Sequence, residues 1–338
     1  MNKDQVRGMY LGTAVGDALG MPVETFSPKK ILEKYPETGG IITEYLVPTG
    51  HKWFDGREAG TWTDDTQLTL AVGQGLVEAK GPDIQSQIKC HIAALKDNTA
   101  GWGKSTKDSI RRLANGTPHT KSGETGPRGG KGNGVPMKIA PVAAYLRWTQ
   151  TSEGFTEHDK MIANQTIFEF ARDLAIMTHP TQMAVVAGFA QIVAVSRCFK
   201  GDDPDTIAAA VAAAAIKAKE WKKGKEDDDL AERLQLLKDY RDYDATRCVE
   251  EFGGGSCYCY NSLPFTYMFF LRNPKSMDAL YDVVSAGGDA DTNGAMLGAM
   301  LGAYNGESIF PKPLVETLDQ ADMILKTADD FCEAFKIK

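Results

Sequence analysis

The chain has 338 residues, of which 42% are hydrophobic and 25% are charged. This composition is close to the average for globular domains and excludes collagen-like, coiled-coil and disordered classes, and the length allows one large domain or about two. With 38 Lys and Arg against 45 Asp and Glu the formal charge is -7, so the composition offers no electrostatic footprint for nucleic acid or an anionic membrane.

The first residues, MNKDQVRGMY, show no apolar run after the initial charges. We find no window of about 18 uncharged apolar residues, so we expect a cytoplasmic protein with no membrane partner. Six cysteines are too sparse for a disulfide framework, and Cys257 and Cys259 form C-x-C rather than the C-x-x-C of zinc ribbons. We expect reduced, partly buried thiols.

Apolar residues recur at three- and four-residue steps along most of the chain, which predicts helices, whereas β-branched runs are short. In chain order, the predicted helices span residues 4–20, 64–80, 84–97, 136–149, 160–178, 181–199, 205–221, 228–240, 276–286, 291–304 and 313–335. We therefore predict an all-α fold, arranged as one compact multi-helix domain over residues 1–338.

Two of the predicted helices carry glycine at every fourth position. The first set is Gly8, Gly12, Gly16 and Gly20, and the second is Gly294, Gly298, Gly302 and Gly306. Residues four apart lie on one side of a helix, where missing side chains let another backbone approach closely. Since glycine in a helix interior costs about 1 kcal/mol, we predict that both helices are central and tightly packed.

Residues 201–262 differ in composition from the rest of the chain. They include a charge run at 222–229 and three consecutive glycines at 253–255. Few apolar residues are available there for an independent core, and no Pro- or Ser-rich linker brackets the stretch. We expect a charged surface excursion of the single domain.

Two acidic motifs each stand directly ahead of a predicted helix: TWTDDT at residues 61–66 and GGDADT at residues 287–292. Helix capping and the helix dipole explain either motif alone, with Thr63 as a natural N-cap. Together they offer four carboxylates with no Lys or Arg inside either motif. Converging carboxylates need cations, and an all-oxygen ligand set suits Mg²⁺ or Mn²⁺. Both the capping and the metal interpretations remain open from spacing alone.

The segment 123–141 is a candidate anion-binding loop. Six glycines lie among residues 123–134, ahead of a helix that Pro136 opens, and such a loop can turn backbone N–H groups toward a diphosphate. Arg128 and Lys131 add positive charge. It is neither a Walker A motif nor a Rossmann fingerprint, and a plain surface loop is the alternative.

Single residues give weaker signals. His179 stands at the break between two predicted helices, which is typical of a helix end, and Glu24 follows the first helix, where an isolated glutamate is usually solvated. The other four histidines show no metal-ligand spacing; they are His51, His91, His119 and His158.

Five motifs occur in a fixed order: GDALG at 16–20 with Pro22 and Glu24, WTDDT at 62–66, GNG at 132–134 with Met137, Ala140 and Pro141, Thr178-His179, and GGDADT at 287–292. This ordered set resembles the ADP-ribosylglycohydrolase family, which includes dinitrogenase-reductase-activating glycohydrolases and ADP-ribosyl-arginine and ADP-ribosyl-serine hydrolases. Two stretches depart from the family pattern: 201–262 is longer and more charged, and 126–131 is unusually rich in glycine.

The resemblance implies an all-α domain with two Mg²⁺ or Mn²⁺ ions at the bottom of an ADP-ribose cleft. The implied metal ligands are Thr63, Asp64, Asp65, Asp289, Asp291 and Thr292. The implied substrate contacts are Gly132, Asn133 and Gly134 near the diphosphate, Met137, and His179 near the ribose. Glu24, Asp64 and Asp291 are the implied catalytic residues, with Glu24 moving protons or orienting the leaving group.

Our leading interpretation is a metal-dependent hydrolase that removes ADP-ribose from a modified side chain, arginine first, by cleaving the bond at the ribose anomeric carbon. Two alternatives stay open: a two-metal phosphohydrolase acting on a nucleotide diphosphate, and a non-catalytic ADP-ribose-binding protein. The expected partner is an ADP-ribosylated protein or small molecule. We expect nucleic acid only as a modified substrate.

Overall fold

The computed structural model describes residues 1–123, 129–152, 156–222 and 228–338. Within these ranges the chain forms seventeen α-helices and four short 3₁₀-helices, and the only β feature there is an isolated bridge between Gly132 and Tyr258. The all-α prediction is confirmed. Residues 124–128 of the candidate anion-binding loop, Arg128 among them, lie outside the described residues.

The elements, in chain order, are α1 (Lys3–Gly20), η1 (Met21–Val23), α2 (Pro28–Lys34), η2 (Pro36–Thr38), α3 (Asp64–Ala79), α4 (Ile84–Asp97), α5 (Lys104–Ala114), α6 (His119–Ser122), η3 (Pro136–Lys138), α7 (Ala140–Thr151), α8 (Glu157–Ile176), α9 (Gln182–Lys200), α10 (Pro204–Lys219), α11 (Leu230–Gln235), α12 (Ala245–Glu251), α13 (Cys259–Arg272), α14 (Asp278–Ser285), α15 (Ala290–Asn305), η4 (Glu307–Ile309), α16 (Lys312–Glu316) and α17 (Ala321–Ala334).

Two kinds of difference separate these helices from the predicted ones. The segment predicted at 313–335 is two helices, because the chain turns between α16 and α17 with Gln320 at φ 55°. Helices α2, α5, α6, α12 and α13 were not predicted. In α13 every residue from Ser262 to Leu271 is buried and Pro264 lies inside the helix, so the segment has no polar face to set a helical period and contains a residue that usually ends helices.

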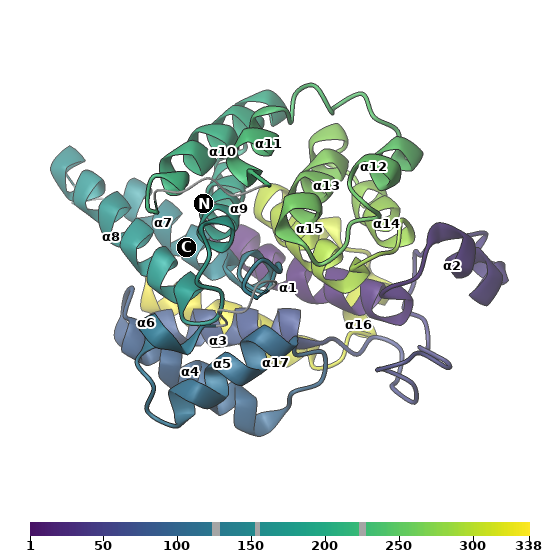
Figure 1. Cartoon of the computed structure of the whole chain (residues 1–338), viewed down its shortest axis with the longest axis horizontal. Helices are drawn as coiled ribbons and strands as arrows, with labels where there is room; N and C mark the ends of the chain where they lie inside the picture. The colour runs from purple at the N-terminus through teal and green to yellow at the C-terminus, as the bar shows by residue number, and fades with distance from the viewer. Residues whose placement is uncertain (124–128, 153–155, 223–227) are drawn as a thin grey trace.

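Helices α1 and α15 lie side by side at the centre of the molecule, between α9 and α10 on one side and α3 and α17 on the other (Figure 1). Their glycine stripes face each other. A Cβ atom added at Gly16 would overlap the carbonyl group of Gly294, and one added at Gly298 would overlap the backbone of Gly12. The prediction of two tightly packed central helices is therefore confirmed, and the contact is backbone against backbone.

The helix pair also brings the ends of three helices together. Gly20, the last residue of α1, packs against the carbonyl of Ala290, the first residue of α15. The start of α3 lies at the same place, because Asp17 of α1 accepts a hydrogen bond from the backbone N–H of Thr63. The two acidic motifs thus stand at one end of the central pair.

Residues 201–262 contribute to the protein core. Ile207 and Val211 of α10 are 1% exposed, and Leu234, Cys248 and Phe252 are fully buried. The expectation of a surface excursion is wrong for these positions, because the long helix α10 and the short helices α11 and α12 all turn apolar residues toward the rest of the chain. Residues 223–227 of the predicted charge run lie outside the described residues.

Helix α9 is long and apolar enough to cross a membrane by length and composition, but 83% of its 18-residue window is buried inside the protein. It packs against α7, α8, α10 and α15. A helix that is apolar all round and covered by other helices is also what a protein core contains.

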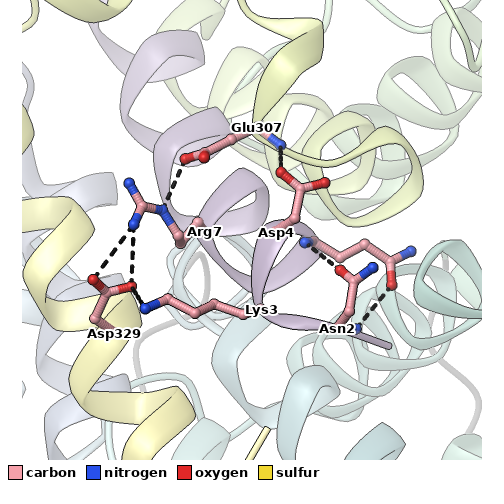
Figure 2. A network of polar contacts seen from close by, with 7 residues as sticks. Asn2, Lys3, Asp4, Arg7, Glu307 and Asp329 are labelled. Atoms are coloured by element: carbon pink, nitrogen blue, oxygen red, sulfur yellow. Dashed lines mark hydrogen bonds and ion pairs between the residues drawn. The ribbon is translucent and has the colours of Figure 1, made fainter. Parts of the chain in front are cut away.

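The amino terminus of α1 is tied to η4, which follows α15, and to α17 by a polar network (Figure 2). Arg7 donates to Glu307 over 2.8 Å and to Asp329 over 3.4 Å, and Lys3 pairs with Asp329 at 3.1 Å. Asp4 accepts a bond from the backbone N–H of Glu307. Partly exposed pairs of this kind contribute little individually, so the glycine contact remains the main constraint on the helix pair.

We predict that Gly16→Ala lowers the free energy of unfolding by about 1–3 kcal/mol, although alanine favours a helix by about 1 kcal/mol, because its Cβ would displace the backbone of α15. Urea denaturation measures the loss. The control is Gly103→Ala at the start of α5, where φ is -59° and a Cβ would meet no atom within 4 Å. Equal stability of Gly16→Ala and wild type would contradict the backbone contact.

Candidate functional site

A cavity of about 1290 Å³ opens at the end of the α1 and α15 pair. Its walls come from segments far apart in sequence, including residues 24–28, 101–106, 130–134, 253–254, 256–258 and 288–289. The predicted site residues that line it are Glu24, Asp64, Asp65, Gly132, Asn133, Gly134, Met137, His179, Asp289, Asp291 and Thr292. Thr63 lies behind this lining, bonded to Asp17.

The acidic side chains of the two motifs converge in this cavity. One oxygen each from Asp17, Asp65 and Asp291 lie within 4.8 Å of one another, and the same holds for Glu24, Asp289 and Asp291. The two groups share Asp291. Two overlapping groups of carboxylates are the arrangement that a pair of neighbouring divalent cations would need.

Asp17 is a site residue that the sequence reasoning did not nominate. Its fully buried carboxylate accepts hydrogen bonds from the backbone N–H groups of Thr63 and Thr66 at 3.0 Å. It also accepts from the hydroxyls of Thr63 at 2.9 Å and Thr66 at 2.6 Å. The signal was available, since an aspartate between Gly16 and Gly20 on a helix buried all round is rare unless its charge is satisfied.

These bonds change the role of Thr63. It occupies the N-cap position of α3, as expected, but its side chain makes no cap bond to that helix. The carboxylate of Asp17 caps α3 from the neighbouring helix instead. Because both oxygens of Asp17 already accept hydrogen bonds, we interpret Asp17 as a brace for the first acidic motif, with Asp65 and Asp291 left to face a cation.

The second acidic motif is held by the glycine-rich segment and by α13. The side-chain amide of Asn133 donates to Asp289 and to the hydroxyl of Ser262. The backbone N–H of Asp289 donates to Gly255 at 3.1 Å. Asn133 therefore joins the predicted diphosphate loop to the metal motif, a link of 156 residues that no local pattern contains.

Gly134 packs directly against His179. A Cβ atom added at Gly134 would lie 2.8 Å from Cε1 of His179 and 3.1 Å from the hydroxyl of Thr106. Nδ1 of His179 is 2.8 Å from the hydroxyl of Thr178. Burial, with a smaller effect from the charge of Lys138, lowers the pKa of His179 to about 3, so the imidazole is neutral at the cavity wall.

Burial shifts the pKa values of the acidic cluster upward. It raises the pKa of Glu24 and of Asp64 to about 8, with added repulsion from neighbouring carboxylates. It raises the pKa of Asp17 and Asp289 to about 6, and that of Asp291 well above its ordinary value. None of the cluster's carboxylates forms an ion pair with Lys, Arg or His within 4.0 Å in the described part of the chain.

The donor set fits a hard divalent cation. Oδ1 of Asp65 is buried and has no hydrogen-bond partner among the described residues, and its pKa is raised well above the ordinary value by burial and by neighbouring carboxylates. A buried oxygen without a partner is costly. Mg²⁺ or Mn²⁺ would supply that partner, and all the candidate ligands are oxygens.

Comparisons with known proteins identify the class to which this fold and site belong. The model of the ADP-ribosylglycohydrolase family matches residues 1–338, and the chain belongs to this family. The resemblance drawn from the five motifs is thereby confirmed, and membership supports an ADP-ribosyl hydrolase.

Named relatives agree with this assignment. The chain is 25% identical to the ADP-ribosyl-dinitrogen reductase glycohydrolase of Rhodospirillum rubrum, over 94% of this chain and 90% of that protein. It is 23% identical to human ADP-ribosylhydrolase ARH3, over 90% of this chain and 86% of that protein. A solved ADP-ribosylglycohydrolase-related protein complex shares the fold, with a TM-score of 0.65, 23% identity and 98% coverage of both chains.

We predict that the metal-free protein loses stability as the pH rises. The folded-state pKa values of Glu24 and Asp64 are about 8, whereas those carboxyls titrate near pH 4 in an unfolded chain. Between about pH 4 and pH 8 the folded state binds more protons, so the free energy of unfolding falls as pH rises.

A divalent cation would replace those protons, so Mg²⁺ or Mn²⁺ should raise the melting temperature more at about pH 8.5 than at about pH 6. Thermal denaturation with chelator and with added metal measures both effects. A metal-free melting temperature that rises across this window would contradict the buried, unpaired state of the carboxylates.

Proposed function

We propose that the protein is a metal-dependent hydrolase that removes ADP-ribose from a modified side chain by cleaving the bond at the ribose anomeric carbon. Arginine is the side chain that we favour as the acceptor. The observation that carries the proposal is the pair of overlapping carboxylate groups, sharing Asp291, in one cavity. Family membership supports the hydrolase class, and the name of the Rhodospirillum rubrum relative describes a protein acceptor of ADP-ribose.

We assign two Mg²⁺ or Mn²⁺ ions to the ligands Thr63, Asp64, Asp65, Asp289, Asp291 and Thr292. Asp65, Asp289 and Asp291 belong to the two carboxylate groups. Asp64 and Thr292 line the same cavity, and Thr63 is bonded to Asp17 behind it. When bound, such ions supply positive charge that orients the ribose hydroxyls and makes a water molecule easier to deprotonate. Asp17 and Asn133 keep the two motifs in place, through Thr63 and Asp289 respectively. The cavity wall at Gly132 to Gly134, Met137 and His179 would contact the diphosphate and ribose.

Glu24 supplies the proton chemistry in this proposal. In the metal-free protein, burial and neighbouring carboxylates raise the pKa of Glu24 to about 8, so its surroundings favour the protonated carboxyl. A protonated carboxyl can give its proton to the leaving nitrogen as the glycosidic bond breaks and later accept a proton from the attacking water. Metal binding would lower this pKa, so the cation and the proton on Glu24 are coupled.

Arginine is favoured as the acceptor by the chemistry around Glu24. Trp53 lines the same cavity and is 52% exposed, whereas Phe26 and Phe54 are buried and pack on His51. A planar guanidinium stacks on aromatic faces and pairs with carboxylates. The products separate this function from the alternatives: free ADP-ribose with an unmodified acceptor, AMP with ribose phosphate, or no product.

We predict that Asp291→Ala abolishes turnover of ADP-ribosylated arginine while the helical fold persists, because it removes the carboxylate common to both groups. Chelator should inactivate the wild type, and Mg²⁺ or Mn²⁺ should restore it. The control is Asp322→Ala, an exposed position at the start of α17. Full activity in excess chelator would refute the metal dependence.

We predict that Glu24→Gln slows turnover by about 10²- to 10⁴-fold, the range for loss of a general acid or base, with ADP-ribose affinity retained. Gln keeps the shape and most of the hydrogen-bonding capacity but cannot transfer a proton. Single-turnover release of ADP-ribose, measured beside affinity at fixed metal, tests this. A near-wild-type rate would remove Glu24 from the mechanism.

A further inference from the structure

The turn that carries Glu24 is strained, and two backbone hydrogen bonds join it to Gly288. Thr25 has φ 64°, a left-handed conformation that is rare for a β-branched residue and persists only where surrounding contacts enforce it. Its backbone N–H donates to the carbonyl of Gly288, and the N–H of Gly288 donates to Phe26 at 2.9 Å. These bonds fix the turn to the second acidic motif.

The third support comes from His51, which the site described above does not use. Nε2 of His51 lies 3.0 Å from the carbonyl oxygen of Glu24, and Nδ1 accepts from the backbone N–H of Trp53 at 3.3 Å. The neutral tautomer with its proton on Nε2 satisfies both bonds. His51 therefore joins the turn of Glu24 to the 51–54 segment of the cavity wall.

The ring of His51 is closely packed. It stacks on Phe54, with centroids 5.0 Å apart and planes 15° apart, and it contacts Phe26 at 5.5 Å. The side chain is 3% exposed. A residue without a donor at position 51 would leave the backbone carbonyl of Glu24 without this bond. The carboxylate of Glu24 forms no ion pair with a cationic side chain among the described residues, so no such pair would hold the residue in its place.

We infer that His51 is a positioning residue for Glu24: its Nε2–H holds the Glu24 carbonyl, and with it the carboxyl, in place over the acidic cluster. The inference rests on the proposed function, which gives Glu24 its proton-transfer role. The competing explanation is that His51 matters only as an aromatic ring packed between Phe26 and Phe54. The first explanation requires the Nε2–H donor, whereas the second requires only the aromatic ring.

Two substitutions separate them. His51→Phe keeps a planar ring but removes the donor, and His51→Gln keeps an N–H donor near the Nε2 position but removes the ring. We expect His51→Phe to lower the single-turnover rate by about 10- to 100-fold, the cost of a misplaced reacting group. ADP-ribose affinity should stay within about 2-fold, and His51→Gln should restore most of the rate.

A double variant and a control variant test whether His51 acts through Glu24. In the Glu24→Gln protein, His51→Phe should change the rate by less than about 2-fold, because groups that act as a unit are not additive. The matched control is His119→Phe on α6, outside the cavity lining, which should leave the rate unchanged. If His51→Phe does not fold, His51→Met supplies the donorless variant.

A readout independent of turnover separates failure of this inference from failure of the proposed function. Hydrogen exchange of the backbone amides of residues 24–27 should accelerate about 10-fold in His51→Phe and not in His51→Gln, because the turn loses one of its supports. Unchanged exchange in His51→Phe, or equal rate losses in both variants, would overturn the inference. Wild-type turnover by Glu24→Gln would instead overturn the proposed role of Glu24, while the exchange result still decides whether His51 holds the turn.

Discussion

The site depends on one contact, the meeting of two helix backbones along the glycine stripes of α1 and α15. Because Gly16 faces Gly294 with no side chain between them, the end of α1 reaches the start of α15. Asp17, one residue after Gly16, then lies close enough to cap α3, and Asp291 lies in the first turn of α15. Three helix ends, each carrying carboxylates, meet as a result.

Such a meeting is electrostatically unfavourable for the protein alone. Desolvation raises the pKa of each carboxyl, and like charges raise most of them further. Buried carboxylates concentrated this way are typical of sites where a cation or a transferred proton is used. The fold contributes hydrogen bonds at two points, Asp17 to α3 and Asn133 to Asp289, and leaves Oδ1 of Asp65 without a partner.

The fold class and the central helix pair could be predicted from periodicity, and the acidic residues that line the cavity from the ordered motifs. What escaped prediction depends on contacts between distant segments. The bond from Asp17 to Thr63 spans 46 residues and that from His51 to Glu24 spans 27, so neither leaves a local pattern. Helix α13 and the buried positions of 201–262 escaped because burial on every face, or a short helix among charges, removes the amphipathic signal.

The glycine contact also limits how this chain can change. Where Gly12 faces Gly298 and Gly16 faces Gly294, both residues are already glycine, so a methyl group gained on one helix cannot be offset by a smaller residue on the other. Any single replacement at these crossings therefore costs stability before it can bring a compensating change. Because the acidic cluster lies at the end of the same helix pair, substitutions far from the cavity along the stripe would act on the site through the spacing of the two helices.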